Sequence, residues 1–149
     1  MKNAMTATLE YLSFLSKHIK KSDTRMVLES SLIALGISSK DKALRYLSEA
    51  VLLYHRDPSL LVVDGIYKEI AAAEENCTVQ RVEITIRRAI GKAWQKRDKK
   101  TWRRFFPNCE RMWPKAPTNR NFIAALADFL SLWEGCYDSF HKEVTAIED

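Results

Sequence analysis

One segment of the chain, residues 78–94, carries side chains suited to hydrogen bonding with the edges of DNA bases. An Arg side chain can donate two hydrogen bonds to O6 and N7 of guanine, and a Gln amide pairs in the same way with N6 and N7 of adenine. On a helical projection, one arc of this segment holds Gln80, Arg81, Ile84, Arg87, Arg88, Gly91 and Lys92. This basic, amide-bearing arc favours recognition of DNA bases, and the competing interpretation is a helix face that is merely solvated.

The apolar residues of the same segment predict the helix that must present these side chains. They fall in an arc of roughly 100°, the width expected of a helix face that packs on a core. Thr78, or Cys77 just before it, is expected to begin this helix. The apolar arc consists of Val79, Val82, Ile86, Ala89, Ile90 and Ala93. One buried face and one basic face are typical of a helix that enters the major groove.

A second helix is predicted just before this one. The sequence Asp57-Pro58-Ser59 indicates a break, because Pro disfavours a helical residue before it and suits a helix start after it. The predicted helix runs from about Ser59 to Ala73, and residues 74–77 form a polar turn. Its apolar side consists of Leu60, Val63, Ile66, Tyr67 and Ile70. The two helices and their turn predict a helix-turn-helix at about residues 59–94.

Positive charge is concentrated around this motif. Residues 78–120 hold 13 Lys and Arg against 3 Asp and Glu, a net charge of +10, whereas the rest of the chain holds 11 and 16, a net charge of −5. Lys99 and Lys100 of this zone are expected to meet phosphates. Such a local excess of positive charge is the electrostatic pattern of a protein that binds a polyanion.

The remaining chain predicts further helices and no strands. An amphipathic helix is expected at residues 3–21, another from Asp23 or Thr24 to Leu35 with Gly36 as its C-terminal cap, and a third before Asp57. Beyond Thr118 as N-cap, a helix with inward apolar residues up to Trp133 is expected to end at Gly135. We therefore predict an all-α protein with a single helical domain of about six to seven helices.

The predicted organisation divides the chain into three parts. Residues 1–22 form an N-terminal amphipathic helix, residues 23–133 form the domain that contains the helix-turn-helix, and residues 134–149 form a C-terminal tail or short helix. Two interpretations of the first helix stay open: it packs on its own domain, or it pairs with a partner chain.

Catalytic, metal-binding and membrane-spanning patterns are not found in the sequence. The three Cys residues lie far apart and show no zinc spacing, and no nucleophile neighbours a His in a recognisable motif. No signal peptide and no run of about 18 apolar residues is present. We predict a protein that is not an enzyme, has no cofactor or metal, does not enter a membrane, and resides in the cytoplasm of a bacterium, on the nucleoid when bound to DNA.

Two groups of motifs resemble the C-terminal effector domain of stage zero sporulation protein A. The first is Thr78-Val-Gln-Arg-Val-Glu with Ile86-Arg-x-Ala-Ile90 and Ala93-Trp94, and the second is Lys115-x-Pro-Thr-Asn119 with Phe122-Ile-Ala and Ala127-Asp128. Leu35-Gly36 and Tyr46-Leu47-x-Glu49-Ala50 also match the pattern. The resemblance extends from about Leu28 to Leu132.

This resemblance implies an all-α domain of about six helices that binds a short promoter element in double-stranded DNA, with two domains head to tail on adjacent sites. A homodimer on DNA, or one formed through the N-terminal helix, is thus a further expectation. Thr118 and Asn119 would add contacts at the phosphate backbone, because a helix N-terminus suits phosphate. The full set of predicted DNA-binding residues is Thr78, Gln80, Arg81, Glu83, Ile84, Arg87, Arg88, Lys92, Lys99, Lys100, Lys115, Thr118 and Asn119.

The sequence departs from the family pattern in three places. The family carries an N-terminal receiver domain, whereas here about 27 residues precede the effector region, so we expect no phosphoreceiver in this chain. Ile84 stands where the family usually has Arg, at the centre of the outward face. The turn before Thr78 is one residue longer than usual. The target sequence is therefore expected to differ from that of the family.

Two functional hypotheses follow. The first is a sequence-specific transcription regulator that places the helix at residues 78–94 in the major groove and acts without its own phosphoreceiver. The alternative is a protein-interaction module that partners or antagonises a full-length sporulation regulator through the helix at 3–21 or the tail at 136–149. The concentrated positive charge favours the first hypothesis, and Ile84 and the additional N-terminal helix favour the second.

Overall fold

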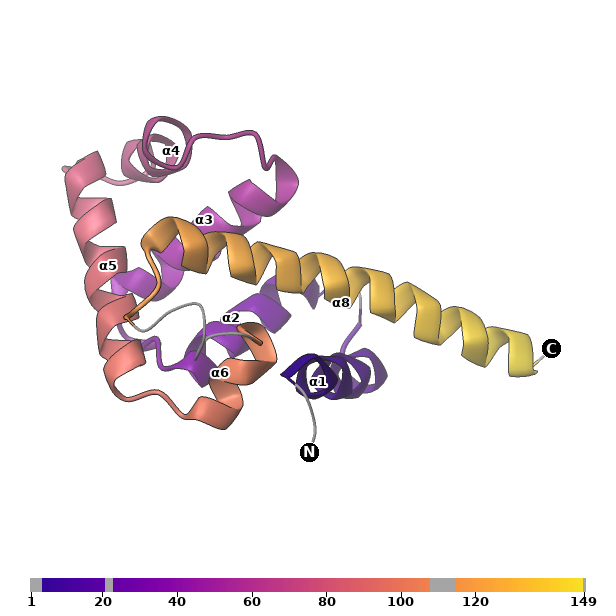
Figure 1. The fold of residues 1–149 in the computed structure, drawn as a ribbon. Coiled ribbons are helices and arrows are strands. Elements are labelled where there is room, and N and C mark those ends of the chain that lie inside the picture. Colours follow the sequence, from indigo (N-terminus) through magenta and orange to yellow (C-terminus); the bar gives the residue numbers. More distant parts are fainter. Residues whose placement is uncertain (1–3, 21–22, 108–114, 149) are drawn as a thin grey trace.

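A computed structural model gives the fold of the chain (Figure 1). It describes the backbone of residues 4–20, 23–107 and 115–148, and the side chains of residues 6–20, 23–107 and 115–139. Every regular element in these ranges is helical, which confirms the all-α prediction. The elements are α1 (Ala4–His18), α2 (Thr24–Leu35), α3 (Lys42–Arg56), η2 (Val62–Tyr67), α4 (Lys68–Ala72), α5 (Val79–Gln95), α6 (Lys99–Phe105) and α8 (Asn119–Glu148).

The longest helix, α8, is the element on which the others assemble. It packs against α3 and α1 most extensively and also contacts α2, α5 and α6. Aromatic side chains fill the centre: Trp102 lies 5.0 Å from Phe106, and Phe105 lies 4.8 Å from Phe129, measured between ring centroids. The C-terminal part of α8 extends beyond the other helices (Figure 1). Burial of these large rings is the main apolar contribution to stability in this part of the fold.

The prediction that Gly135 ends the last helix is wrong, and residues 134–148 do not form a separate tail. Helix α8 continues through Gly135 to Glu148. Among the described glycines only Gly36 has a positive φ, so Gly135 keeps a helical backbone. A single Gly inside a helix costs about 0.5–1 kcal/mol relative to Ala, which packing on both sides can offset. Trp133 is fully buried just before it, and its ring packs 5.9 Å from that of Tyr137 just after it.

The first helix of the predicted helix-turn-helix begins later than expected, at Val62 instead of Ser59. The Asp57 carboxylate accepts hydrogen bonds from the Ser59 backbone N–H at 3.1 Å and from the Ser59 hydroxyl at 2.6 Å. These bonds hold residues 57–60 in a turn, because a short acidic side chain competes with the helix for the same backbone N–H groups. Leu61 then has an extended backbone with ψ of 137°.

The element η2 is a π-helical turn that continues directly into α4. The Ile66 N–H donates to the Leu61 carbonyl, five residues back. This wider turn advances the side chains less per residue than an α-helix does, so a count based on 3.6 residues per turn misplaces them. Val63, which that count placed on the apolar side, is 53% exposed, whereas Ile66 and Tyr67 are buried.

Helix α1 packs on its own domain, against α8 and α6. Leu12 and Leu15 are buried there, and the ring of Tyr11 packs against those of Phe105 and Phe129, at 5.5 Å and 6.0 Å between centroids. Leu9 is 49% exposed and Phe14 is 57% exposed. The helix is therefore part of the core on one side and presents two large apolar side chains to solvent on the other.

Candidate nucleic-acid interface

Helix α5 begins at the predicted position. Thr78 has an extended backbone, and its Oγ1 accepts a hydrogen bond from the Arg81 N–H at 3.1 Å. This is a standard N-terminal cap, which satisfies one of the backbone donors left free at a helix start. The helix ends at Gln95, one residue after the predicted Trp94.

The turn before α5 is anchored to α3. The Arg45 guanidinium forms an ion pair with Glu74, and the Tyr46 hydroxyl lies 3.7 Å from the Cys77 sulfur. Asn76 has φ of 55°, a left-handed conformation that Asn tolerates better than most residues. These contacts set where α5 starts relative to the preceding helices.

The apolar side of α5 fixes its rotation about its own axis. The residues buried on this side are Val82, Ile86, Ile90 and Ala93, and Val79 and Ala89 pack half-buried against the same core. Gly36, with φ of 111°, caps α2 and approaches α5 so closely that a Cβ atom there would lie 3.2 Å from the Cβ of Ala93. The predicted buried arc is thereby confirmed.

The opposite side of α5 presents basic side chains to solvent. Gln80, Arg81, Arg88 and Lys92 are exposed, and none of them has an ion-pair or hydrogen-bond partner for its side chain among the described residues. Ile84 is half-buried among them. The polar groups of this face are therefore available to an external ligand with negative charge and hydrogen-bond acceptors.

Glu83 and Arg87 form an ion pair on the same helix. The Arg87 Nη1 lies 2.8 Å from the Glu83 Oε1, and the Arg87 side chain is 63% exposed. An exposed pair with this spacing contributes only about 0.3–0.5 kcal/mol. Arg87 can therefore exchange Glu83 for a stronger acceptor at small cost.

The flanks of α5 hold further exposed cations. Lys99 and Lys100 occupy the first turn of α6, where the helix dipole disfavours positive charge. Asp98 caps this helix through hydrogen bonds from the Thr101 hydroxyl and N–H, and these bonds hold the pKa of the Asp98 carboxyl below its usual value. Lys115 is exposed just before α8. The two lysines of α6 thus face solvent beside the end of α5.

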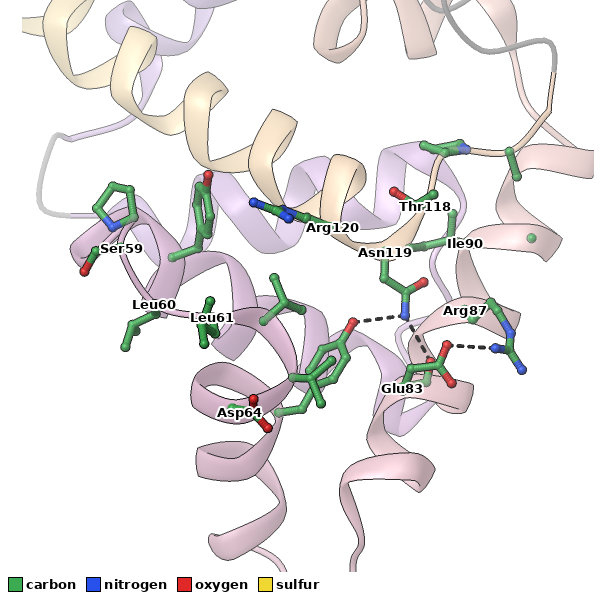
Figure 2. A pocket seen from close by; sticks show the side chains of 18 residues that line it. Ser59, Leu60, Leu61, Asp64, Glu83, Arg87, Ile90, Thr118, Asn119 and Arg120 are labelled. Atoms are coloured by element: carbon green, nitrogen blue, oxygen red, sulfur yellow. Dashed lines mark hydrogen bonds and ion pairs between the residues drawn. The ribbon is translucent and has the colours of Figure 1, made fainter.

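The start of α8 is tied to α5 by Asn119. Its Nδ2 donates to the Glu83 carbonyl at 3.1 Å and to the Tyr67 hydroxyl at 3.0 Å (Figure 2). Thr118 is exposed and caps the helix, because its Oγ1 accepts from the Asn121 N–H at 3.1 Å. The Asn119 amide, which sequence reasoning assigned to DNA, therefore links α8, α5 and η2 within the protein.

Arg97 and Arg120 are among the arginines of the basic zone that lie outside the predicted set. The Arg97 guanidinium lies 3.9 Å from the ring centroid of Trp94 and donates to the Trp94 carbonyl, so its role is structural. Arg120 is exposed in the first turn of α8 and has no ion-pair partner among the described residues. The only signal for Arg120 in the sequence was its place two residues after the N-cap Thr118.

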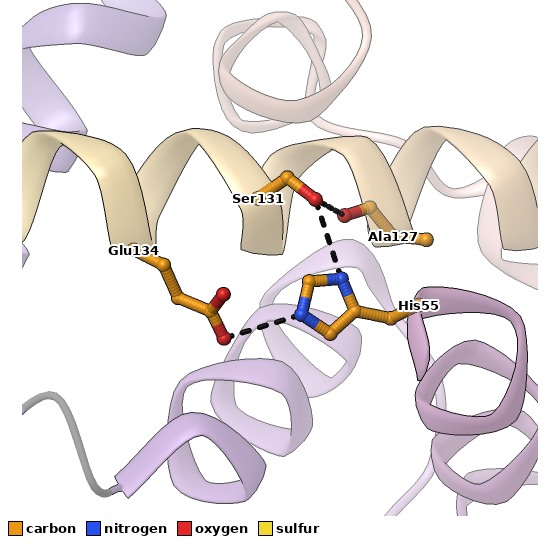
Figure 3. Close-up of polar contacts among 4 residues, drawn as sticks. All are labelled: His55, Ala127, Ser131 and Glu134. Atoms are coloured by element: carbon orange, nitrogen blue, oxygen red, sulfur yellow. Dashed lines mark hydrogen bonds and ion pairs between the residues drawn. The ribbon is translucent and has the colours of Figure 1, made fainter. Parts of the chain in front are cut away.

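A cluster of His55, Ser131 and Glu134 joins α3 to α8 (Figure 3). The His55 Nε2 lies 3.2 Å from the Glu134 Oε1, and its Nδ1 lies 3.3 Å from the Ser131 hydroxyl. Sequence reasoning missed this cluster because 76 residues separate His55 from Ser131. Ser131 also reaches the Ala127 carbonyl, and the N–H groups around it belong to the interior of a helix, so none is free to form an oxyanion hole. We interpret the cluster as a clamp between two helices.

Two kinds of site are absent from the described residues, 4–20, 23–107 and 115–148. No group of three or more His, Cys, Asp or Glu side chains is placed there to hold a metal ion. None of the described helices is both long enough and apolar enough to cross a bilayer.

Comparison with protein families gives one match. Residues 28–130 match the family described as "Sporulation initiation factor Spo0A C terminal". The matched range begins within α2 and ends within α8, so it contains η2, α4, the whole of α5 and α6. It excludes α1 and the projecting end of α8.

Proposed function

Because the chain belongs to the family of Spo0A C-terminal domains, a DNA-binding family and not an enzyme family, we propose that it is a sequence-specific transcription regulator. In this proposal α5 lies in the major groove of double-stranded DNA, and η2 with α4 crosses the backbone beside it. The residues of this chain are expected to suffice for binding to DNA.

The observation that carries the proposal is the outer face of α5. Arg81, Arg88 and Lys92 extend to solvent without partners among the described residues, on a helix whose opposite side is locked into the core. Rigid placement of α5 matters because recognition of a base requires two hydrogen bonds in a fixed geometry. The planar guanidinium of Arg supplies them as two parallel N–H donors. Gln80 adds an amide that can pair with adenine.

The surrounding residues support the proposal through contacts to the phosphates. Four exposed residues follow α5 in the chain and can meet the backbone of the duplex. They are Lys99 and Lys100 on α6, Lys115 before α8 and Thr118 at its N-cap. Contacts to phosphate set affinity and orientation on the duplex, whereas contacts to base edges set sequence preference. The two groups of residues therefore have different expected effects.

Fluorescence polarization with labelled duplexes of random sequence, at two salt concentrations, tests the proposal directly. Binding should weaken steeply as salt rises, because counterions are released when cations meet phosphates. Absence of binding at about 50 mM salt would refute DNA binding by this chain.

Ile84 offers a test of the orientation of α5. An isoleucine at this position can at most touch a thymine methyl group. The substitution Ile84→Arg should tighten binding and move the preference toward guanine at one position of the selected sequence. An unchanged preference in a sequence-selection experiment would mean that α5 docks in another orientation.

A second candidate function is a module that partners or antagonises a full-length sporulation regulator. The specific observation in its favour is the exposure of Leu9 and Phe14 on α1, outside the matched family range. Sedimentation of the full chain and of a Leu9→Ser, Phe14→Ser variant tests self-association through this face. If the wild-type chain stays monomeric at high concentration, the proposed homodimer through α1 is refuted.

A further inference from the structure

A cleft of about 810 Å³ lies between η2, α5 and the start of α8 (Figure 2). Its volume falls in the range of about 300–1,000 Å³ that is usual for sites of small molecules. It lies inside the helix-turn-helix region, between the two helices and the N-terminus of the helix that supports them. It is thus separate from the basic outer face of α5, although the two share a boundary.

One wall of the cleft is apolar and lacks a partner within the described chain. Leu61 is 67% exposed and Val63 is 53% exposed, and both line the cleft together with Leu60 and Ile90. Leu61 and Val63 face outward because of the turn at Asp57 and the π-helical geometry of η2. An apolar molecule in the cleft would remove both side chains from water.

The other side of the cleft offers hydrogen-bond donors and one free positive charge. Arg120 is exposed there and has no partner among the described residues. Tyr67 is 1% exposed, its hydroxyl oxygen accepts from Asn119, and its hydroxyl hydrogen has no acceptor within the described ranges. A carboxylate can accept two parallel hydrogen bonds from the Arg120 guanidinium.

The charged side chains of the lining favour a ligand with one negative charge over one with several. Glu83 is neutralised by Arg87, and Arg120 is the remaining cation of the lining. Asp64, on the first turn of η2, is exposed and also lines the cleft, so it repels a polyanion such as a nucleoside triphosphate. The N-terminus of α8, at Asn119 and Arg120, adds the positive end of a helix dipole.

We propose that this cleft binds a small amphipathic monocarboxylate, with its apolar body along Leu61 and Val63 and its carboxylate on Arg120. Nothing in the DNA-binding proposal requires such a site. The occupant would lie beside Glu83 and Arg87, which line the cleft from α5. Because the cleft and the basic side of α5 share Arg87, occupancy should weaken DNA binding, and this consequence rests on the proposed function.

Calorimetric titration of the full chain with three ten-carbon probes tests the site. The probes are decanoate, decanol and decyltrimethylammonium, each kept below the concentration at which it forms micelles. Decanoate should bind one to one, about tenfold more tightly than decanol, because a charge-assisted hydrogen bond is worth roughly that factor. The cationic probe should bind most weakly.

Two variants and one control assign the binding to the residues named. Arg120→Gln should weaken decanoate about tenfold and leave decanol unchanged, whereas Leu61→Ser should weaken both probes. Lys17→Gln removes an exposed charge from α1 and should change neither. Circular dichroism establishes that each variant is folded before it is titrated.

Three outcomes would overturn the proposal: no saturable binding of decanoate, many decanoate molecules per chain, or equal affinity for decanoate in the wild type and Arg120→Gln. Equal binding of decanol and decanoate would show an apolar groove without a carboxylate site, and would refute it as well. Changes in the chemical shifts of backbone amides that are confined to the cleft, within residues 58–67, 83–91 and 116–120, would support it.

The link to DNA is measured separately, by polarization of a bound duplex in the presence of decanoate. If the two ligands exclude each other, decanoate at ten times its dissociation constant should weaken DNA binding about tenfold. Decanoate binding without this effect would refute the link and keep the site. Failure of the chain to bind any duplex would refute the proposed function and leave the titration result unaffected.

Discussion

The two helical parts of the helix-turn-helix differ in how their structure arises. In α5, the N-cap, the 3.6-residue period and the charge pattern all indicate the same helix, and the structure has it almost residue for residue. In η2 with α4, an aspartate turn delays the start and a π-helical turn shifts the register. Agreement among local signals produces a regular helix, whereas competition among them produces an irregular one that leaves Leu61 and Val63 exposed.

The regular helix α5 and the irregular element η2 also present different surfaces. The regular helix presents polar groups outward in a fixed geometry, as base reading requires. The irregular helix exposes apolar groups and forms one wall of a cleft. Asn119 connects the two, since its amide donates to the Glu83 carbonyl of α5 and to the Tyr67 hydroxyl of η2.

The largest expected effect is a loss of stability in η2, and it tests whether this element has a π-helical or an α-helical register. Ile66→Ala should lower the free energy of unfolding by about 2–5 kcal/mol, because a fully buried side chain is truncated. Val63→Ala, three residues earlier, should change it by no more than about 0.5 kcal/mol, because Val63 is exposed. Urea unfolding measures both. A Val63→Ala cost equal to that of Ile66→Ala would place Val63 in the core and contradict the π-helical turn.

The next effect concerns the outer face of α5. Arg88→Ala should cost about 1–3 kcal/mol of DNA binding on the preferred sequence and less on random sequence, because a base contact is lost. Lys99→Ala serves as the matched control, since loss of a phosphate contact should weaken all sequences alike and reduce the salt slope by about 1. Fluorescence polarization on both duplexes provides the data. Equal losses on every sequence for Arg88→Ala would refute its role as a reader.

Loss of the hydrogen bonds by which Asn119 connects α5 and η2 should have a smaller effect. Asn119→Ala removes two hydrogen bonds, each worth about 1 kcal/mol, and should lower the free energy of unfolding by about 1–2 kcal/mol. Asn121→Ala, an exposed neighbour on the same helix, is the control and should be nearly neutral. Thermal unfolding compares the two variants. If both melt at the wild-type temperature, Asn119 does not hold the helices together.

The smallest effect is at the start of α5. Thr78→Ala should destabilise the protein by about 1 kcal/mol, because the Arg81 N–H loses its acceptor. Thr78→Ser retains the hydroxyl and should restore most of the stability. Both are measured by chemical unfolding. A Ser variant as unstable as the Ala variant would mean that the methyl group, and not the cap, is what matters.

Much of the fold and part of the candidate site followed from sequence alone. The buried arc of α5, the cap at Thr78 and the glycine cap at Gly36 all depend on contacts between residues a few positions apart, and such contacts are encoded locally. The family motifs place the same segment in a known arrangement, and the family match agrees with it. The roles of the individual base-reading residues stay predictions.

Other features were decided by the tertiary structure. The amide of Asn119 is occupied by Glu83 and Tyr67, and the imidazole of His55 meets Ser131 and Glu134 across 76 and 79 residues of chain. Sequence spacing carries no information about such encounters, because they depend on how whole helices pack. The same is true of the cleft, because the start of α8 closes a space between η2 and α5 from more than twenty residues further along the chain.

The sequence by itself determined that α5 has one face for the core and one basic face, because helical period and charge are local properties. Only the tertiary structure decided where η2 begins and which of its residues face solvent, because the Asp57 turn and the packing of Ile66 and Tyr67 outweigh intrinsic helix preference there. It also decided that Gly135 lies inside α8, since the burial of Trp133 and the contact of its ring with Tyr137 offset the weak helix preference of a single glycine.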